Sequence, residues 1–98
     1  MLARWGNEDY FFLGRVEQRR ENDEMHIVYL DGDRAWVRLD DLRRDTVRAG
    51  ASVHIHVQGH DGWAPAVVTQ RSGNRIEADV GSQRVWVALG MVRVREAR

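Results

Sequence analysis

The chain has 98 residues, 43% hydrophobic and 31% charged, which predicts one small soluble domain or two very small ones. It has no cysteine, which excludes disulfides and thiolate metal sites, and its 15 basic and 15 acidic residues leave no positive field typical of a duplex-DNA-binding protein. The longest uncharged apolar stretch, residues 10–13, is far shorter than the roughly 20 residues of a membrane span, and the first residues resemble no secretory leader, so we expect an intracellular protein.

Strand patterns alternate with turn residues along the whole chain, which predicts an all-β protein. The expected strands, in chain order, are 2–6, 10–18, 24–31, 34–39, 52–58, 63–71, 75–80 and 84–89. Single helical turns are expected at 40–42 and 90–92, and a short linker at 45–50. No segment has a long helical period.

The two halves of the chain follow the same plan when they are aligned at an offset of about 50 residues. The segment 35–39 (AWVRL) parallels 85–89 (VWVAL), and a glycine turn precedes each tryptophan. We therefore expect a first small barrel at 1–46 and a second at 50–95. A barrel of this size buries too few side chains to offset the backbone entropy lost on folding, so the two are expected to pack together.

Aromatic residues are concentrated at the beginning of the chain, where the strand 10–18 carries them on both faces. Tyr10 and Phe12 point to one face, while Phe11 and Leu13 point to the other. One face must supply a core. The other is expected either to pack on the second half or to remain partly open.

Three aromatic residues from successive strands, Trp5, Phe12 and Tyr29, are expected to form an open box with Asp31 and Asp33 at its rim. Ring faces attract methylated ammonium groups by about 0.5–2 kcal/mol per ring, and a carboxylate accepts any remaining N–H. The alternative is that these rings simply fill the interior of a small barrel.

Four segments carry a resemblance to a known family: 2–5 (LARW), 10–16 (YFFLGRV), 27–33 (IVYLDGD) and 81–86 (GSQRVW). Together they are similar to the tandem Tudor module of DNA-damage checkpoint mediators, and the resemblance covers essentially the whole chain. It implies two tandem SH3-like barrels packed together, with a methyl-lysine cage in the first.

By position, the resemblance implies that the cage residues are Trp5, Phe12, Tyr29 and Asp31. Asp33 stands where the family has a further aromatic residue, which leaves the cage one wall short.

The second half is expected to have no cage, because Val57 and Ala64 stand where the first half has two of its cage rings. Trp63 is in phase with Phe11 and not with Phe12, which favours a role in packing between the two barrels. Trp36 and Trp86 recur at the same place in both halves, which favours a shared structural role near a strand end.

His54 and His56 lie on the same face of one predicted strand, with His60 and Asp61 at the following turn, a spacing at which imidazoles can bind a divalent metal. No third ligand is fixed by the pattern, so we expect titrating histidines on a solvated edge strand and no metal site. No serine stands in a nucleophile elbow, and no glycine loop precedes a helix to hold a phosphate, so neither catalysis nor nucleotide binding is expected.

The sequence therefore predicts a non-enzymatic binding module, without a cofactor, that reads methylated lysine or arginine in a basic peptide. Glu8, Asp9 and Tyr10 are expected at the rim of its cage. One alternative is a nucleic-acid-binding barrel, in which runs of arginine, including the one at the C-terminus, contact the phosphate backbone. Its candidate residues are Arg43, Arg44, Arg93 and Arg95. Another alternative is an assembly module whose sheet edges or surface aromatic residues join a partner or a second copy. No membrane partner is expected, and the chain is expected to be a monomer or a weak homo-oligomer.

Overall fold

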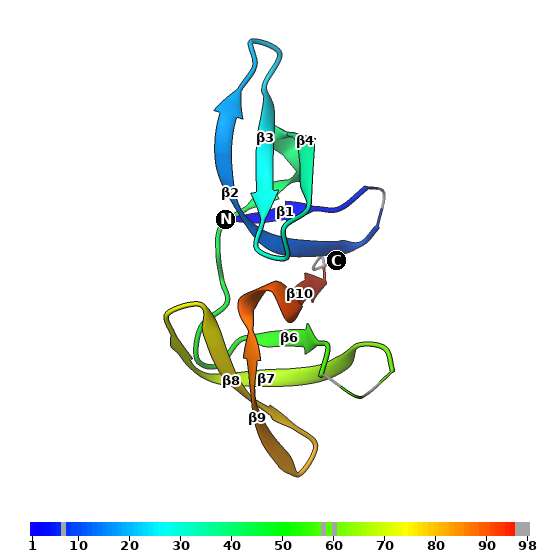
Figure 1. The fold of residues 1–98 in the computed structure, drawn as a ribbon, viewed down its shortest axis with the longest axis vertical. Helices are drawn as coiled ribbons and strands as arrows, with labels where there is room; N and C mark the ends of the chain where they lie inside the picture. Colours follow the sequence, from blue (N-terminus) through cyan, green and yellow to red (C-terminus); the bar gives the residue numbers. More distant parts are fainter. Residues whose placement is uncertain (7, 58, 60, 96–98) are drawn as a thin grey trace.

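Ten strands and two short 3₁₀-helices make up the computed structural model, whose described residues are 1–6, 8–57, 59 and 61–95 (Figure 1). In chain order the elements are β1 (Leu2–Arg4), β2 (Tyr10–Arg19), β3 (Glu24–Tyr29), β4 (Arg34–Arg38), η1 (Leu39–Asp41), β5 (Leu42–Arg43), β6 (Ser52–Ile55), β7 (Ala64–Ser72), β8 (Arg75–Val80), β9 (Gln83–Ala88), η2 (Leu89–Met91) and β10 (Val92–Arg95). The prediction of an all-β protein is confirmed.

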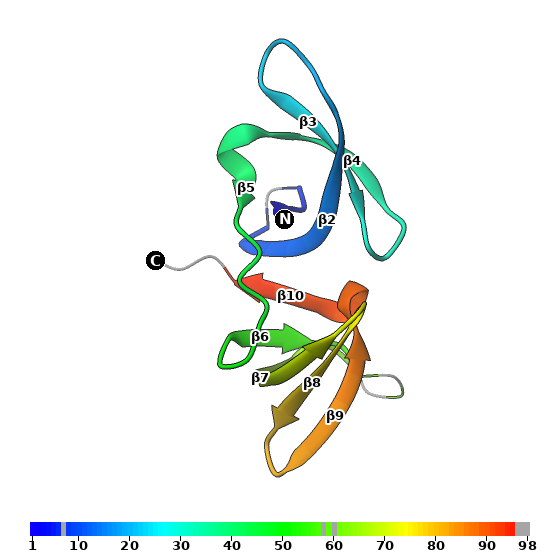
Figure 2. The ribbon, with the colours of Figure 1, turned by 90° about the vertical axis from the view of Figure 1, so that its left-hand side faces the viewer.

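The strands form one curled antiparallel sheet in the order β4-β3-β2-β10-β6-β7-β8-β9, with β1 pairing with β2 and β5. Sequence patterns missed both short strands β5 and β10. The second omission matters most, because β10 lies between β2 of the first half and β6 of the second and so joins the two halves through backbone pairing (Figure 2).

Each half repeats one local plan: a short strand, a long strand, two further strands and a 3₁₀ turn that leads into the last strand. Both long strands contain an irregularity at the same place, between Val16 and Gln18 in β2 and between Val68 and Gln70 in β7. Such bulges increase the local twist, which helps a short sheet to curl. The two 3₁₀ turns begin one residue before the predicted helical turns.

Two apolar clusters form the core, and the boundary between them does not follow the boundary between the halves. The smaller cluster belongs to the first half and consists of Ala3, Met25, Ile27, Tyr29 and Val37. The larger cluster contains the buried side chains of the second half together with Leu2, Phe11 and Leu13 of the first. Of the two alternatives left open for the strand 10–18, packing on the second half is the one observed, through Phe11 and Leu13.

Two sequence-based expectations about the second half need correction. The strand β6, expected at a solvated edge, lies inside the sheet because both β10 and β7 pair with it. Trp63 precedes β7 and is not part of the strand. The end of the predicted strand 52–58, Gln58, lies outside the described residues. Among the described residues, no helix has the length and apolar character needed to cross a membrane.

Candidate functional site

The candidate site contains two aromatic rings of the first half. Trp5 follows β1 and Tyr29 ends β3, and their ring centroids lie 5.3 Å apart with the planes at 84°, an edge-to-face contact. Trp5 is 37% exposed, whereas Tyr29 is 2% exposed and donates a 2.8 Å hydrogen bond from its hydroxyl to the carbonyl oxygen of Arg4. Tyr29 therefore lies beneath Trp5 and presents no open ring face.

Two carboxylates, those of Asp31 and Asp41, lie near Tyr29. Burial, together with the smaller effects of the Asp31 and Asp41 carboxylates, raises the pKa of Tyr29 to about 12. Asp41 also forms an ion pair with Arg4, whose Nε lies 2.9 Å from the Asp41 carboxylate. The carboxylate of Asp31 accepts a 3.0 Å hydrogen bond from the backbone N–H of Asp33 and so orders the turn between β3 and β4.

Phe12 belongs to a different set of contacts. Its ring meets Trp63 edge-to-face at 5.8 Å, and it is half-buried against the smaller core cluster. Among the ring contacts of residues 1–6, 8–57, 59 and 61–95, the described part of the chain, none joins Phe12 to Trp5 or Tyr29. These residues show an edge-on pair, Trp5 on Tyr29, and not an open box of three rings.

A hollow of about 400 Å³, here called the Trp5 groove, lies between the end of β1 and the outer edge of β4. Its lining includes Arg4, Trp5, Trp36, Arg38 and Asp41. Sequence reasoning gave Trp36 only a structural role and did not single out Asp41. The available signal was that a tryptophan recurs at the same position in both halves, in β4 and in β9. The sequence pattern did not show that the edge of β4 beside this tryptophan is open.

Trp36 is already in contact with two basic side chains. The guanidinium of Arg20 lies 3.6 Å from the centroid of its ring, and the ring of His26 lies 4.9 Å away. The exposed ring of Trp5 is therefore the more available aromatic surface in the Trp5 groove.

The predicted rim residues separate from one another in the structure. Glu8 is exposed in the loop after Trp5, and its carbonyl oxygen accepts a 3.0 Å hydrogen bond from Arg4. Asp9 is half-buried in the same loop. Tyr10 begins β2 and lies with the residues that join the two halves, where its ring contacts His54 at 5.6 Å.

A second cluster joins the halves and is here called the junction cluster; it consists of Tyr10, Phe12, His54, Trp63 and Arg93. The guanidinium of Arg93 lies 3.6 Å from the centroid of Tyr10 and 4.4 Å from that of Trp63, and its buried Nε has no hydrogen-bond partner among the described residues. Phe12, Arg93 and His54 face one another across β2, β10 and β6. Trp63 thus contacts side chains of both halves, as predicted.

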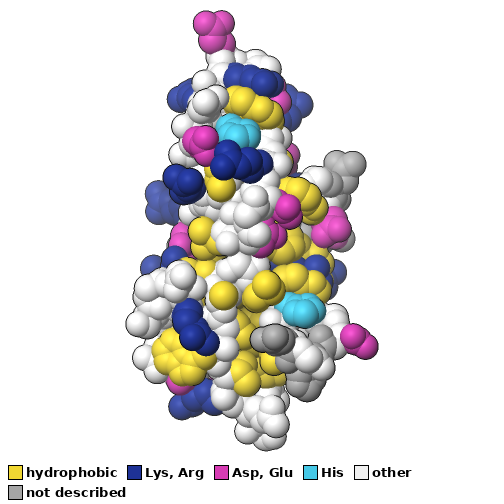
Figure 3. All heavy atoms as spheres, viewed as in Figure 1, with side chains coloured by type: hydrophobic (Ala, Val, Ile, Leu, Met, Phe, Trp, Pro, Cys, Tyr) yellow, Lys and Arg dark blue, Asp and Glu magenta, His cyan; other side chains and the backbone are white. Residues whose placement is uncertain are grey.

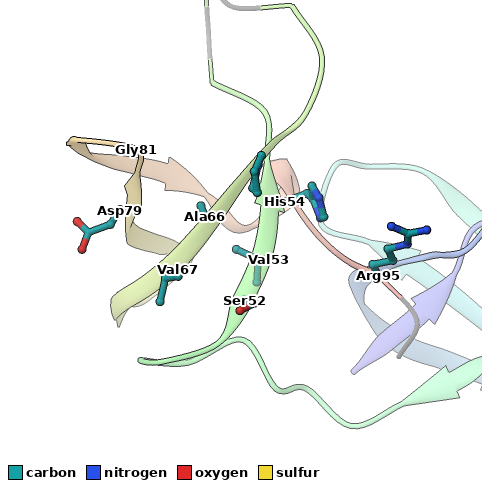
Figure 4. Close-up of a pocket in the computed structure, with 9 residues that line it drawn as sticks. Ser52, Val53, His54, Ala66, Val67, Asp79, Gly81 and Arg95 are labelled. Carbon is teal, nitrogen blue, oxygen red and sulfur yellow. The ribbon is translucent and has the colours of Figure 1, made fainter. Parts of the chain in front are cut away.

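The arginines proposed for nucleic-acid contact have different surroundings. Arg43 lies over the ring of Phe11 at 5.0 Å and donates hydrogen bonds to the carbonyl oxygens of Asp40 and Leu42, and Arg93 is held in the junction cluster. Arg44 is exposed. Arg95 flanks a hollow of about 510 Å³ whose other side carries Asp79 (Figure 4). These surroundings do not favour a common phosphate-binding surface.

His54 in β6 and His56, one residue after the end of that strand, each contact an aromatic ring. His54 contacts Tyr10, and His56 contacts Trp63 at 5.7 Å. Burial and the nearby charges of Arg93 and Arg95 lower the pKa of His54. Within the described part of the chain, no group of three or more histidine or acidic side chains could hold a metal ion. His60 lies outside the described residues, as does Arg98 at the end of the basic C-terminal run.

Comparison with known proteins adds no family to this geometry: no protein-family model matches the chain, and no curated protein matches it significantly.

Proposed function

We propose that the chain is a non-enzymatic binding module of two tandem SH3-like, Tudor-type barrels, at 1–46 and 50–95, that holds a methylated lysine or arginine side chain of a basic peptide. The observation that supports this proposal best is the position of Trp5. Trp5 is 37% exposed, and its ring packs on Tyr29 near the carboxylate of Asp31 and that of Asp41, which is paired with Arg4. A cation is attracted both by the ring face and by these charges.

In the proposed mechanism, the methylated group lies against the exposed ring of Trp5 on its Tyr29 side. Asp31 accepts a hydrogen bond from any remaining N–H of the guest, and Asp33 attracts neighbouring basic residues of the peptide. Arg38 lines the Trp5 groove and repels a cation, which favours the side nearer Asp31. Because Tyr29 is buried beneath Trp5, the guest reaches Tyr29 only if Trp5 tilts away. Gly6, with a φ of +58°, follows Trp5 and provides a backbone that can accommodate such a tilt.

The test is an NMR titration of the whole chain with free lysine and with its mono-, di- and trimethylated forms, followed by dimethylarginine. We expect the indole N–H signal of Trp5 to shift, and dimethyllysine to bind more tightly than trimethyllysine, because only the former keeps an N–H for Asp31. Trp5→Ala is expected to abolish the response. Trp86→Ala is the matched control, because it removes another exposed tryptophan, 41% exposed, from the other half.

Three outcomes would contradict the proposal: no shift at Trp5 at millimolar ligand, equal binding of unmodified lysine, or an unchanged response in Trp5→Ala. Oligonucleotide binding that weakens steeply with salt and survives Trp5→Ala would support the nucleic-acid alternative instead.

A further inference from the structure

The strand β9 forms the end of the sheet in the second half, and a hollow runs beside it. In the described part of the chain, β9 pairs with β8 on one side and with no strand on the other. The hollow, here called the β9 groove, has a volume of about 710 Å³ and is lined by His56, Val57, Arg75, Trp86, Val87 and Met91, among others. Apolar side chains gather over this half of the molecule, in the lower part of Figure 3.

The register of the sheet determines which backbone groups face the β9 groove. The backbone N–H of Leu89 donates a 2.8 Å hydrogen bond to Asn74, which makes residues 74 and 89 a hydrogen-bonded pair. Because such pairs alternate along an antiparallel ladder, Val87 and Val85 also bond to β8. The N–H and C=O groups of Trp86 and Ala88 therefore point away from β8, toward the open edge, where an extended chain can pair with them.

The side chains around this edge are mainly apolar, unlike those of the equivalent groove in the first half. Trp86 is 41% exposed and Met91 is 43% exposed. In the repeat, Met91 stands at the position of Asp41, and Ala88 stands at that of Arg38. The Trp5 groove therefore contains an ion pair and a further arginine along its strand edge, whereas the β9 groove exposes a tryptophan and a methionine.

One basic residue gives the β9 groove a charge preference. Arg75 begins β8 opposite Ala88 and is exposed, and among the described residues it makes no ion pair or side-chain hydrogen bond. It lies beside Trp86, since the two residues also line a smaller hollow of about 320 Å³. A guest at this edge therefore meets open backbone groups, an apolar surface and one available guanidinium, which together favour a carboxylate next to an apolar side chain.

We propose that the open edge of β9 takes an extended, acidic segment of a partner protein as an additional strand. One apolar side chain of that segment packs against Trp86 and Met91, and a neighbouring aspartate or glutamate pairs with Arg75. This site is separate from the one proposed at Trp5 and takes a partner of the opposite charge. A basic peptide at Trp5 and an acidic segment at β9 do not compete for one surface.

The test is selection from a random-peptide phage library on the immobilised whole chain, followed by NMR titration of the selected peptide. We expect the selected peptides to combine an apolar residue with an acidic one, and their amide shifts to be concentrated in β9. Ala88→Pro removes one N–H from the open edge and is compatible with the backbone, because the φ of Ala88 is −67°. We expect it to weaken binding roughly two- to tenfold, the range for one neutral hydrogen bond.

Arg38→Pro is the matched control, because it removes the equivalent N–H from β4 at a φ of −72° and should leave this binding unchanged. Arg75→Glu provides a second variant that does not alter the backbone, and it should weaken binding of the acidic peptides while Trp5→Ala should not. The proposal is overturned if no peptide is selected, if the selected peptides shift Trp5 and not β9, or if Arg75→Glu binds them as well as the native chain. It is also overturned if light scattering shows a dimer that Ala88→Pro dissociates, because a second copy then occupies the edge.

Discussion

Replacing Phe11 with alanine is expected to lower the free energy of unfolding by about 3–5 kcal/mol. Phe11 is 2% exposed, and its ring lies in the larger core cluster, where β2 of the first half meets side chains of the second. Loss of the buried ring removes about 1.5–3 kcal/mol of transfer free energy. A residual cavity of roughly 50–80 Å³ adds about 1–2 kcal/mol at about 24 cal/mol per Å³.

Two guanidinium groups also depend on this ring. Arg4 lies 4.8 Å and Arg43 5.0 Å from its centroid, and each such contact contributes about 0.5–1 kcal/mol at an exposed site. Phe11→Leu keeps most of the buried volume but loses both contacts, so it should cost less than Phe11→Ala and more than a volume-conserving change elsewhere in the core.

The assay is urea unfolding at equilibrium, followed by tryptophan fluorescence and far-UV circular dichroism in parallel. Because Phe11 packs in a cluster that contains both halves, both signals should shift together and in one transition. Phe12→Ala is the control, since Phe12 is the half-buried neighbour on the other strand face and should cost only about 1–2 kcal/mol. A cost below about 1 kcal/mol for Phe11→Ala would refute this account of the core. So would two separate transitions, which would mean that the halves are stable independently.

Three further predictions concern Gly14, Tyr29 and His54. Gly14→Ala should lower the free energy of unfolding by about 1–3 kcal/mol in the same urea assay, because a Cβ there would lie 2.7 Å from Cγ2 of Ile27; an unchanged midpoint would show that β2 and β3 can separate at no cost. Tyr29→Phe should cost about 0.5–1.5 kcal/mol at neutral pH through loss of the hydrogen bond to Arg4. Because the pKa of Tyr29 is raised from 10 to about 12 in the folded chain, its contribution to the free energy of unfolding is complete below pH 10 and is lost as the pH rises toward 12. The native chain should therefore lose stability relative to Tyr29→Phe over that range. Parallel curves of stability against pH for the two chains would contradict the shift. Burial lowers the pKa of His54 in the folded chain, so the stability that neutral His54 contributes is present above the ordinary histidine pKa and is lost as the pH falls below it. In thermal unfolding scans, His54→Gln should reduce this loss of stability at acid pH. An unaltered dependence of the melting temperature on pH would exclude His54 as its source.

The repeat gives the two halves equivalent grooves but different side chains within them. In the first half, Asp41 pairs with Arg4 beside an exposed tryptophan, and in the second, Met91 stands in the position of Asp41. Since both grooves lie along an end strand of the sheet, their backbone groups are alike and the side chains decide what each can bind. The two proposals, a cationic guest at Trp5 and an acidic strand at β9, follow from that difference.

Local sequence patterns were sufficient to predict the all-β class, eight of the strands and the two helical turns, because alternating apolar residues and turn glycines act over a few neighbours. They also indicated that Phe11 and Leu13 face the opposite side from Phe12. Only the tertiary structure decided what each face meets, because β10, a segment singled out in the sequence only for its arginines, lies between β2 and β6 and joins the halves. That pairing places Phe12 beside Trp63 and Arg93, and the packing of Trp5 covers Tyr29. The rings were identifiable one by one, but which of them share a surface depends on contacts between residues far apart in the chain.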